Sequence, residues 1–452
     1  MNTAFGRTVT ACLLLAAVAA TVQAGQPAQR IARRVDQLLA AETAAANDAD
    51  GTAAQVDDAT FLRRVTLDLI GRSPSPEEIT AFVLDPDEGK RAAAINRLLA
   101  DEAFGENWAR YWRDVMLSRR NDERALNASQ SVLTYLTEAF NEGTPWDELA
   151  ASFVTATGGL NSNGATALIA SQWGETEDTT SEICRVLMGV QISCAQCHDH
   201  PTDRWSREQF HELAAFFPRL RVRRNRDPDT GKRREFEVVS FDRQPKRKPK
   251  QAPANRFAVE HRMPDLDDPT AEGTLMQPVF FVTGQSLELG ETDLDRRQQL
   301  ADWMTSSENE WFAKAFVNRI WAELVGEGFY EPIDDLGPDR ECSAPQTIDL
   351  LAAQFEANDY DVKWLYRTIM LTDVYGRASR PPRNSDETPF EAVCVQRLRS
   401  DQVFDSLVNF LGVEEAQDKA ARRAGRPSRR ATTPRQMFAE AKSPARFPRP
   451  CS

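Results

Sequence analysis

Apolar residues recur at helical spacing along most of this chain. Between residues 28 and 120, positions such as Ile31 and Val35 fall on one face of an α-helical period. Asp57 precedes a further periodic stretch and Gly71 follows it, and these are residue types that cap the two ends of a helix. The pattern predicts a mainly α, multi-helical fold.

The helical period continues through the rest of the chain with one interruption. Further helices are predicted at 90–99, 104–117, 130–156 (two helices, split at 141–145), 179–190, 206–217, 296–325, 347–355, 362–371 and 401–411. Trp108, Tyr111 and Trp112 share one helical face. A stripe of this kind indicates core packing rather than a cofactor-binding surface.

The interruption is a basic tract that begins at Arg219 and runs to Lys250. Residues 235–241 and 279–282 have the composition and alternation of strands. We therefore expect a small β insertion between two helical regions. A run of basic residues is typical of a solvated face, and docking of an acidic partner is the alternative interpretation.

The N-terminus has the pattern of an export signal. Arg7 is followed by the short apolar run 11–20 and then by small residues at Val22 and Ala24. The run is too short to span a bilayer. We expect a mature chain that starts near Gly25, has no stable membrane span and is periplasmic or secreted.

These features divide the chain into five expected parts. They are a signal peptide at 1–24, a helical domain at 28–218, a basic linker with the β insertion at 219–290, a second helical domain at 291–412 and a disordered basic tail at 413–452.

Composition narrows the possible functions. Apolar residues make up 41% of the 452 residues and charged residues 27%, which is typical of a globular protein. The formal net charge of −13 argues against a general nucleic-acid binder. No Ser-His-Asp arrangement, P-loop or Gly-rich dinucleotide motif is found, so no catalytic residue is predicted.

Cys194, Cys197 and His198 form a C-x-x-C-H motif, the attachment pattern of c-type haem. Two thiols about one helical turn apart can each form a thioether with a haem vinyl group. The histidine that follows can turn toward the iron as the proximal ligand. Because haem of this type is attached after export, the motif agrees with the signal peptide.

Other interpretations of the motif stay open. A zinc site is the main alternative, built from Cys194 and Cys197 with His198 or His200, although the usual second pair of ligands is missing. A redox disulfide and a purely structural disulfide are further alternatives.

The second axial ligand of a haem iron would come from elsewhere in the chain. The candidates are His200, His211, His261, Met263 and Met188, of which His200 is too close along the chain to reach the opposite haem face easily. An axial ligand on that face favours simple electron transfer, and its absence would leave a position for a small molecule.

The motif lies in a sequence that resembles a known family. The blocks 58–72 and 108–114, followed by 189–201 and 213–217, resemble the planctomycete DUF1549 domain, also called PSCyt2 or the planctomycete cytochrome-type domain. The blocks 296–303, 316–321 and 332–336 resemble the companion DUF1553 (PSD1) domain. The resemblance implies an exported, mostly helical protein in two parts.

The chain departs from the second domain's pattern at two places. Glu323 stands where the family usually has a histidine, and residues 340–345 replace its usual Asn-Pro-Pro-Ser-His-Pro-like turn.

The first functional hypothesis is an exported c-type haem protein that transfers electrons or supports an extracellular redox process with a partner protein. The second is a zinc-binding protein or hydrolase that uses the same Cys/His cluster. The third is a non-catalytic cell-envelope protein that docks through the basic tract and β insertion.

Overall fold

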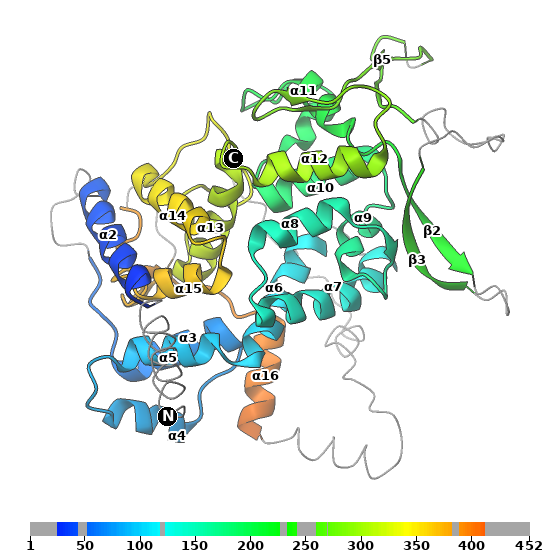
Figure 1. The fold of residues 1–452 in the computed structure, drawn as a ribbon. Coiled ribbons are helices and arrows are strands. Elements are labelled where there is room, and N and C mark those ends of the chain that lie inside the picture. The colour runs from blue at the N-terminus through cyan, green and yellow to red at the C-terminus, as the bar shows by residue number, and fades with distance from the viewer. Residues whose placement is uncertain are drawn as a thin grey trace, which may run out of the picture.

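The computed structural model describes residues 25–43, 52–117, 123–226, 233–241, 259–268, 270–381 and 388–411. The predicted signal peptide (1–24) and basic tail (413–452) lie outside the described residues. The described residues form helices with only small sheets, so the predicted mainly α fold with a small β insertion is confirmed (Figure 1). None of the described helices is both long and apolar enough to cross a bilayer.

The first helical region begins with α2 and ends with α11. Its helices are α2 (Gly25–Thr43), α3 (Asp58–Ile70), α4 (Pro76–Leu84), α5 (Lys90–Leu99), α6 (Glu102–Leu117), α7 (Glu123–Glu142), α8 (Trp146–Thr155), α9 (Ala167–Ser171), α10 (Thr176–Met188) and α11 (Arg207–Ala214). Two short 3₁₀ turns, η2 (Gly164–Thr166) and η3 (Ile192–Gln196), lie among them. The predicted caps of α3 are confirmed: the Asp57 carboxylate accepts from the Thr60 backbone N–H, and Gly71 has φ 73°.

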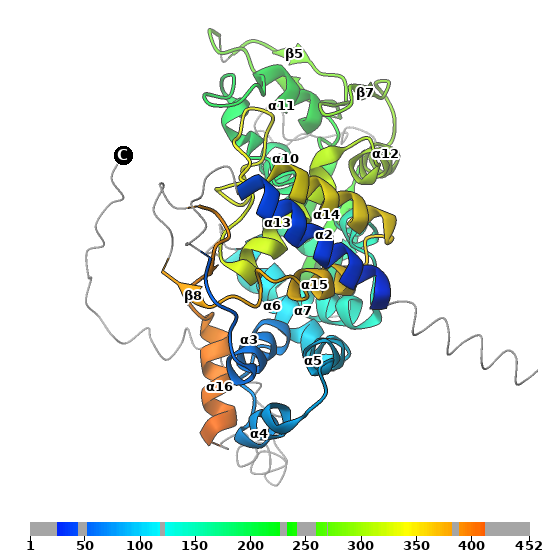
Figure 2. The same ribbon diagram turned by 90° about the vertical axis from the view of Figure 1, so that its left-hand side faces the viewer.

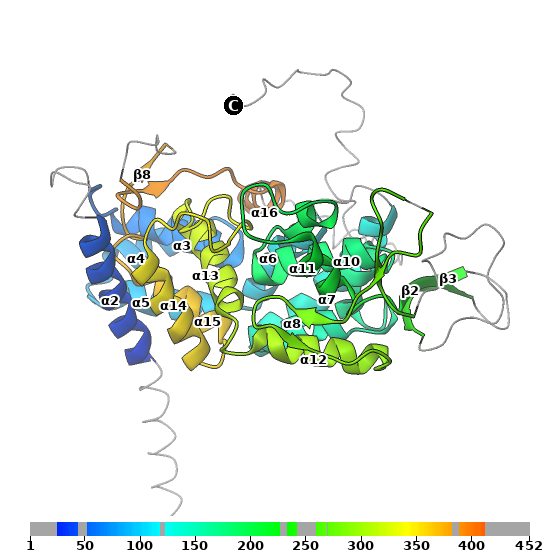
Figure 3. The same ribbon diagram turned by 90° about the horizontal axis from the view of Figure 1, so that it is seen from above.

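The strands form one three-stranded sheet and three two-stranded sheets in the described chain. The larger sheet has the order β1 (Gly158–Gly159), β3 (Arg233–Ser240), β2 (Leu220–Arg226), all antiparallel. The pairs are β4 (Arg262–Met263) with β5 (Thr274–Leu275), β6 (Val279–Phe280) with β7 (Gln285–Ser286), and β8 (Ser379–Arg380) with β9 (Val393–Cys394). The β2–β3 hairpin lies at the opposite end of the molecule from α2 (Figure 3).

The second helical region contains α12 (Asp293–Thr305), α13 (Glu310–Val325), α14 (Pro345–Ala357), α15 (Val362–Met370) and α16 (Ser400–Leu411). The single stretch predicted at 296–325 is therefore two helices. Asn309 separates them, because its side chain accepts from the Trp311 backbone N–H and starts α13.

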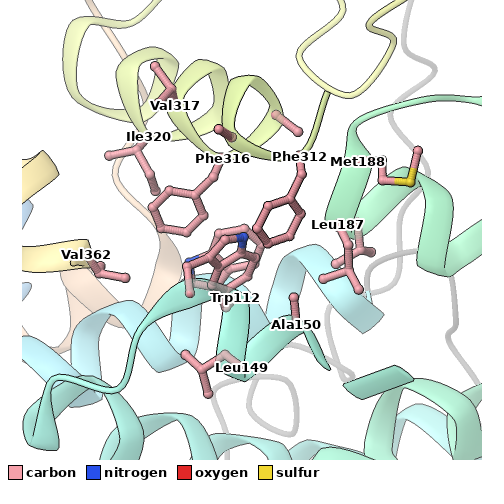
Figure 4. Packing of buried hydrophobic residues seen from close by; sticks show 14 of the residues in the cluster. Trp112, Leu149, Ala150, Leu187, Met188, Phe312, Phe316, Val317, Ile320 and Val362 are labelled. Atoms are coloured by element: carbon pink, nitrogen blue, oxygen red, sulfur yellow. The ribbon is translucent and has the colours of Figure 1, made fainter. Parts of the chain in front are cut away.

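One apolar core runs through both helical regions, with α13 at its centre. Trp112 of α6 stacks on Phe316 of α13 with ring centroids 5.5 Å apart (Figure 4). The ring centroid of Trp146 of α8 lies 4.5 Å from that of Phe316. Trp108 and Trp112 are buried, as the stripe predicted, whereas Tyr111 is only half-buried. Burial of this aromatic surface joins the two regions into one body.

The first helix also packs on the second region. α2 lies against α14 and α15 (Figure 2). The Glu42 carboxylate at the end of α2 accepts from the backbone N–H groups of Gln346 (2.6 Å) and Thr347 (3.2 Å), in the first turn of α14. A carboxylate there satisfies otherwise unpaired helix N–H groups.

Candidate functional site

The C-x-x-C-H motif occupies the 3₁₀ turn η3 and the residues just after it, between α10 and α11. Ile192 and Ala195 point into the core, where both are fully buried. Cys194 and Cys197 are exposed free thiols. The turn therefore anchors itself through its apolar residues and presents both sulfur atoms on its outer side.

The ring of His198 is held by its own turn. Its Nδ1 lies 2.7 Å from the carbonyl oxygen of Asp199. Because a carbonyl only accepts, Nδ1 carries the proton and donates it. In the neutral ring Nε2 then has a free lone pair, which is the tautomer of a metal-binding histidine. His198 is exposed, as Cys194 and Cys197 are.

Two further histidines, His211 and His261, form a buried pair that hydrogen-bonds to the turn. His211 of α11 donates from Nε2 to the carbonyl oxygen of Gln196 (3.1 Å), and its Nδ1 lies 2.8 Å from Nε2 of His261. His211 is 1% exposed and His261 6%. Burial lowers the pKa of both imidazoles well below the usual value, so the pair is neutral at physiological pH.

The remaining candidate ligands have different surroundings. The backbone N–H of His200 donates to the Trp205 carbonyl (2.8 Å), and its Nδ1 accepts from the Thr202 backbone N–H (3.3 Å). Met263 is half-buried on β4, and Met188 is buried at the end of α10. Within the described ranges, no three His, Cys, Asp or Glu side chains gather closely enough to hold a metal ion.

A loop of the second helical region packs directly against the motif. The Leu336 backbone N–H donates to the Gly189 carbonyl (2.7 Å), and Gln191 Nε2 donates to Asp334 Oδ1 (3.1 Å). Arg185 of α10 pairs with the other oxygen of Asp334 at 2.9 Å, with its own side chain 4% exposed. These contacts fix both the end of α10 and the entry to η3.

The same loop, residues 332–340, also contacts the segment that follows the motif. Arg340 Nε lies 3.6 Å from the buried carboxylate of Asp203 and its Nη2 lies 2.8 Å from Asp335. The sequence indicates Asp203 as an acid close to the motif that could orient an imidazole N–H, but it gives no reason to assign Arg340 or Asp335 to the site. The only signal was that 332–336 belongs to a block resembling the second domain, because nothing local shows that this block meets the motif.

Comparison with known families matches both halves of the chain. Residues 34–222 match the family model PSCyt2, a protein of unknown function (DUF1549), and residues 296–445 match PSD1, a protein of unknown function (DUF1553). The two families and their order are those that the sequence blocks resemble, so that prediction is confirmed. No match was found among curated proteins or solved structures.

Proposed function

The chain belongs to the family that joins a PSCyt2 (DUF1549) domain to a PSD1 (DUF1553) domain, and we propose that it is an exported protein with covalently attached c-type haem. The observation that carries the proposal is that Cys194 and Cys197 are exposed free thiols and that His198 is exposed with its Nδ1 held by the Asp199 carbonyl, which leaves Nε2 free.

Each residue of the turn has a distinct part in holding the group. The S–H of Cys194 and that of Cys197 would each add across one vinyl double bond, which gives two thioethers with no leaving group. His198 Nε2 would bind the iron, and the Asp199 carbonyl keeps the proton on Nδ1. The His211–His261 pair holds the turn in place through Gln196. When bound, haem supplies one-electron redox chemistry.

The proposed role is electron transfer, or redox support of an extracellular process, with a partner protein that exchanges the electron. Three observations support it: the export pattern at 1–24, the attachment motif and the exposure of the motif's outer side. A group held by these exposed residues would suit electron exchange with another protein, because the electron would cross a short distance at the protein surface.

The test is a visible spectrum with intact-protein mass, after export in cells that contain haem-attachment machinery. We expect the wild type to gain the mass of one haem and the C194A/C197A variant to gain none. C342A, which removes a half-buried thiol on another segment, is the matched control and keeps the haem.

H198A separates attachment from iron ligation. We expect it to retain covalent haem through both thioethers but to show an altered spectrum, because the proximal nitrogen is gone. A colourless wild type would overturn the haem proposal. Stoichiometric zinc in that colourless sample, lost in C194A/C197A, would favour the zinc-binding alternative at the same residues.

A further inference from the structure

The last described helix, α16, packs on the molecule through its polar side. In Figures 1 and 2 it lies at the lower edge of the body, beside α3. Gln402 is 7% exposed and donates from Nε2 to the backbone carbonyl of Leu67 in α3 at 3.3 Å. Asp401 and Asp405 face the same way, because Arg110 of α6 pairs with both. The helix is therefore attached by hydrogen bonds and ion pairs.

The opposite side of α16 is apolar and points to solvent. Four residues form this apolar stripe, and their exposed fractions are 42% for Val403, 43% for Phe404, 54% for Leu407 and 85% for Phe410. No described side chain of α16 belongs to the hydrophobic core. A surface helix normally places its apolar stripe on the core and its polar residues in water. The reversed orientation of α16 therefore marks an interaction surface.

The spacing of exposed residues on α16 is that of a seam between two helices. Ser400, Val403, Leu407 and Phe410 follow one another in steps of three, four and three, and all four are exposed. Positions with these steps line up where one helix meets another in a coiled coil. None of the four residues is charged, so a second helix can cover the line without burying a charge.

A lipid surface is a poor match for this stripe. Helices that lie in the membrane interface carry Lys and Arg on their polar side. α16 contains neither, and its two acidic residues, Asp401 and Asp405, are both paired with Arg110 on the side that faces the protein. The helix therefore offers no cation of its own to a lipid phosphate.

The chain that follows α16 is also a poor match. Residues 412–452 contain 10 Lys and Arg residues but only four large aliphatic or aromatic ones. These four are Val413, Met437, Phe438 and Phe447. Covering an uncharged apolar stripe requires apolar surface, and a segment of this composition brings little of it.

We propose that the apolar stripe of α16 is a homodimer interface, on which α16 of a second copy of this chain packs about a two-fold axis. A second copy brings a stripe of the same length that is equally free of charge, so the surface is complementary to itself. In Figures 1 and 2, α16 lies at the opposite end of the molecule from α11, which supports the cysteine turn. The dimer therefore leaves that turn uncovered, and the proposal does not depend on haem.

The test is the molar mass of the whole exported chain in solution, measured by light scattering and sedimentation across the micromolar range. A reducing buffer excludes dimers linked through the exposed thiols of Cys194 and Cys197. We expect a monomer–dimer equilibrium in the wild type. Leu407→Glu should weaken self-association about tenfold or more, because it places like charges across the seam. Its melting temperature should match that of the wild-type monomer, since Leu407 is outside the core.

Leu294→Glu is the matched control. Leu294 lies in α12 and is 55% exposed, against 54% for Leu407, so the same chemical change is made at an equally exposed position of another helix. This variant should self-associate like the wild type.

Two results would overturn the proposal. One is a wild type that stays monomeric throughout the range, and the other is a dimer that Leu407→Glu does not weaken. Strong protection of α16 from hydrogen exchange in such a monomer would indicate that residues 412–452 cover the stripe. Flotation of the monomer with phosphatidylglycerol vesicles would indicate a lipid surface instead.

Discussion

The four histidines do not all carry the proton on the same ring nitrogen, and in each ring a hydrogen-bonded neighbour sets its position. The Asp199 carbonyl fixes the proton of His198 on Nδ1, whereas His200 accepts at Nδ1. His211 donates from Nε2 to a carbonyl and accepts at Nδ1 from His261. Of these rings, His198 combines an exposed position with a free Nε2, and this makes it the best-prepared ligand of the four.

Removing the His211 side chain, which hydrogen-bonds to the cysteine turn, should destabilise the turn. His211→Ala leaves the part-buried Gln196 carbonyl and the buried His261 ring without their shared partner. We expect a loss of about 1–3 kcal/mol in the free energy of unfolding. Chemical denaturation measures that loss, and hydrogen exchange should show faster opening of residues 192–198.

His200→Ala is the control for this prediction. Its ring accepts one long bond of 3.3 Å and is only half-buried, so we expect a change within about 0.5 kcal/mol. Equal effects of the two substitutions would show that the buried pair does not support the turn.

The acid group of Glu323 should make stability fall as the pH rises. Its pKa is near 4.5 in the unfolded chain and about 7 in the fold. Between these values the folded protein keeps a proton that the unfolded chain has released, so a higher pH favours unfolding. Between pH 5 and 8 we expect the free energy of unfolding of E323Q to fall by about 1–2 kcal/mol less than that of the wild type. This difference is smaller than the full pKa shift would give, because the side chain is partly exposed.

Urea unfolding at pH 5 and pH 8 measures this difference. Glu310→Gln, an exposed carboxyl at the start of the same helix, should follow the wild type at both pH values. If E323Q loses as much stability as the wild type between pH 5 and 8, Glu323 does not retain its proton in the fold.

For single residues, the sequence predicts the features that depend only on neighbouring positions in the chain. The C-x-x-C-H motif of Cys194, Cys197 and His198 is recognised from spacing alone, and it lies in η3 and the residues just after it; its role as a haem site stays a prediction. The electrostatic effect of Asp68 on Glu323 has no sequence signal, because the two residues lie in different family domains, far apart along the chain.

Among the elements, the helices with strong end signals were predictable. Ser75 caps α4 with its side chain and Pro76 occupies the first turn, and both residue types favour these positions at a helix start. Strand β2 (Leu220–Arg226) was missed, because arginines occupy most of it and its only apolar residues are Leu220 and Val222. Strand β1 has no signal in the sequence, because its two glycines pair with β3 through the backbone alone.

The glycine between α10 and the cysteine turn permits a close approach that larger residues would prevent. Gly189 has φ 64°, and a Cβ there would lie 3.0 Å from both Ala315 Cβ and Leu336 Cδ1. We expect Gly189→Ala to destabilise the protein by about 2–4 kcal/mol, from backbone strain plus overpacking. Thermal and urea unfolding measure the change.

Gly143 separates the two contributions. It has φ 78°, and a Cβ there would have nothing within 4 Å. Gly143→Ala should therefore show the backbone strain alone, about 1–2 kcal/mol. If the two variants lose the same stability, contact with α13 and with Leu336 is not what requires glycine at 189.

For the whole molecule, the sequence predicts two helical regions and a β insertion, but not how closely the regions combine. The first helix packs on the last ones because Glu42 caps α14 and the Asp36 carboxylate accepts from the Asp373 backbone N–H at 2.9 Å. Contacts between residues so distant in the chain depend on the final packing, which periodicity along one segment does not encode.

The shared core should make the two family domains unfold together. Trp112 of the first domain stacks on Phe316 of the second, so separating the domains exposes the largest apolar surfaces of both. We expect calorimetry of the whole chain to give one transition. Fragments 25–226 and 291–411 should each lack a cooperative transition on their own, and mixing them should restore one. A fragment that melts cooperatively alone, near the temperature of the whole chain, would show that its domain is stable without the other and that the core is two cores in contact.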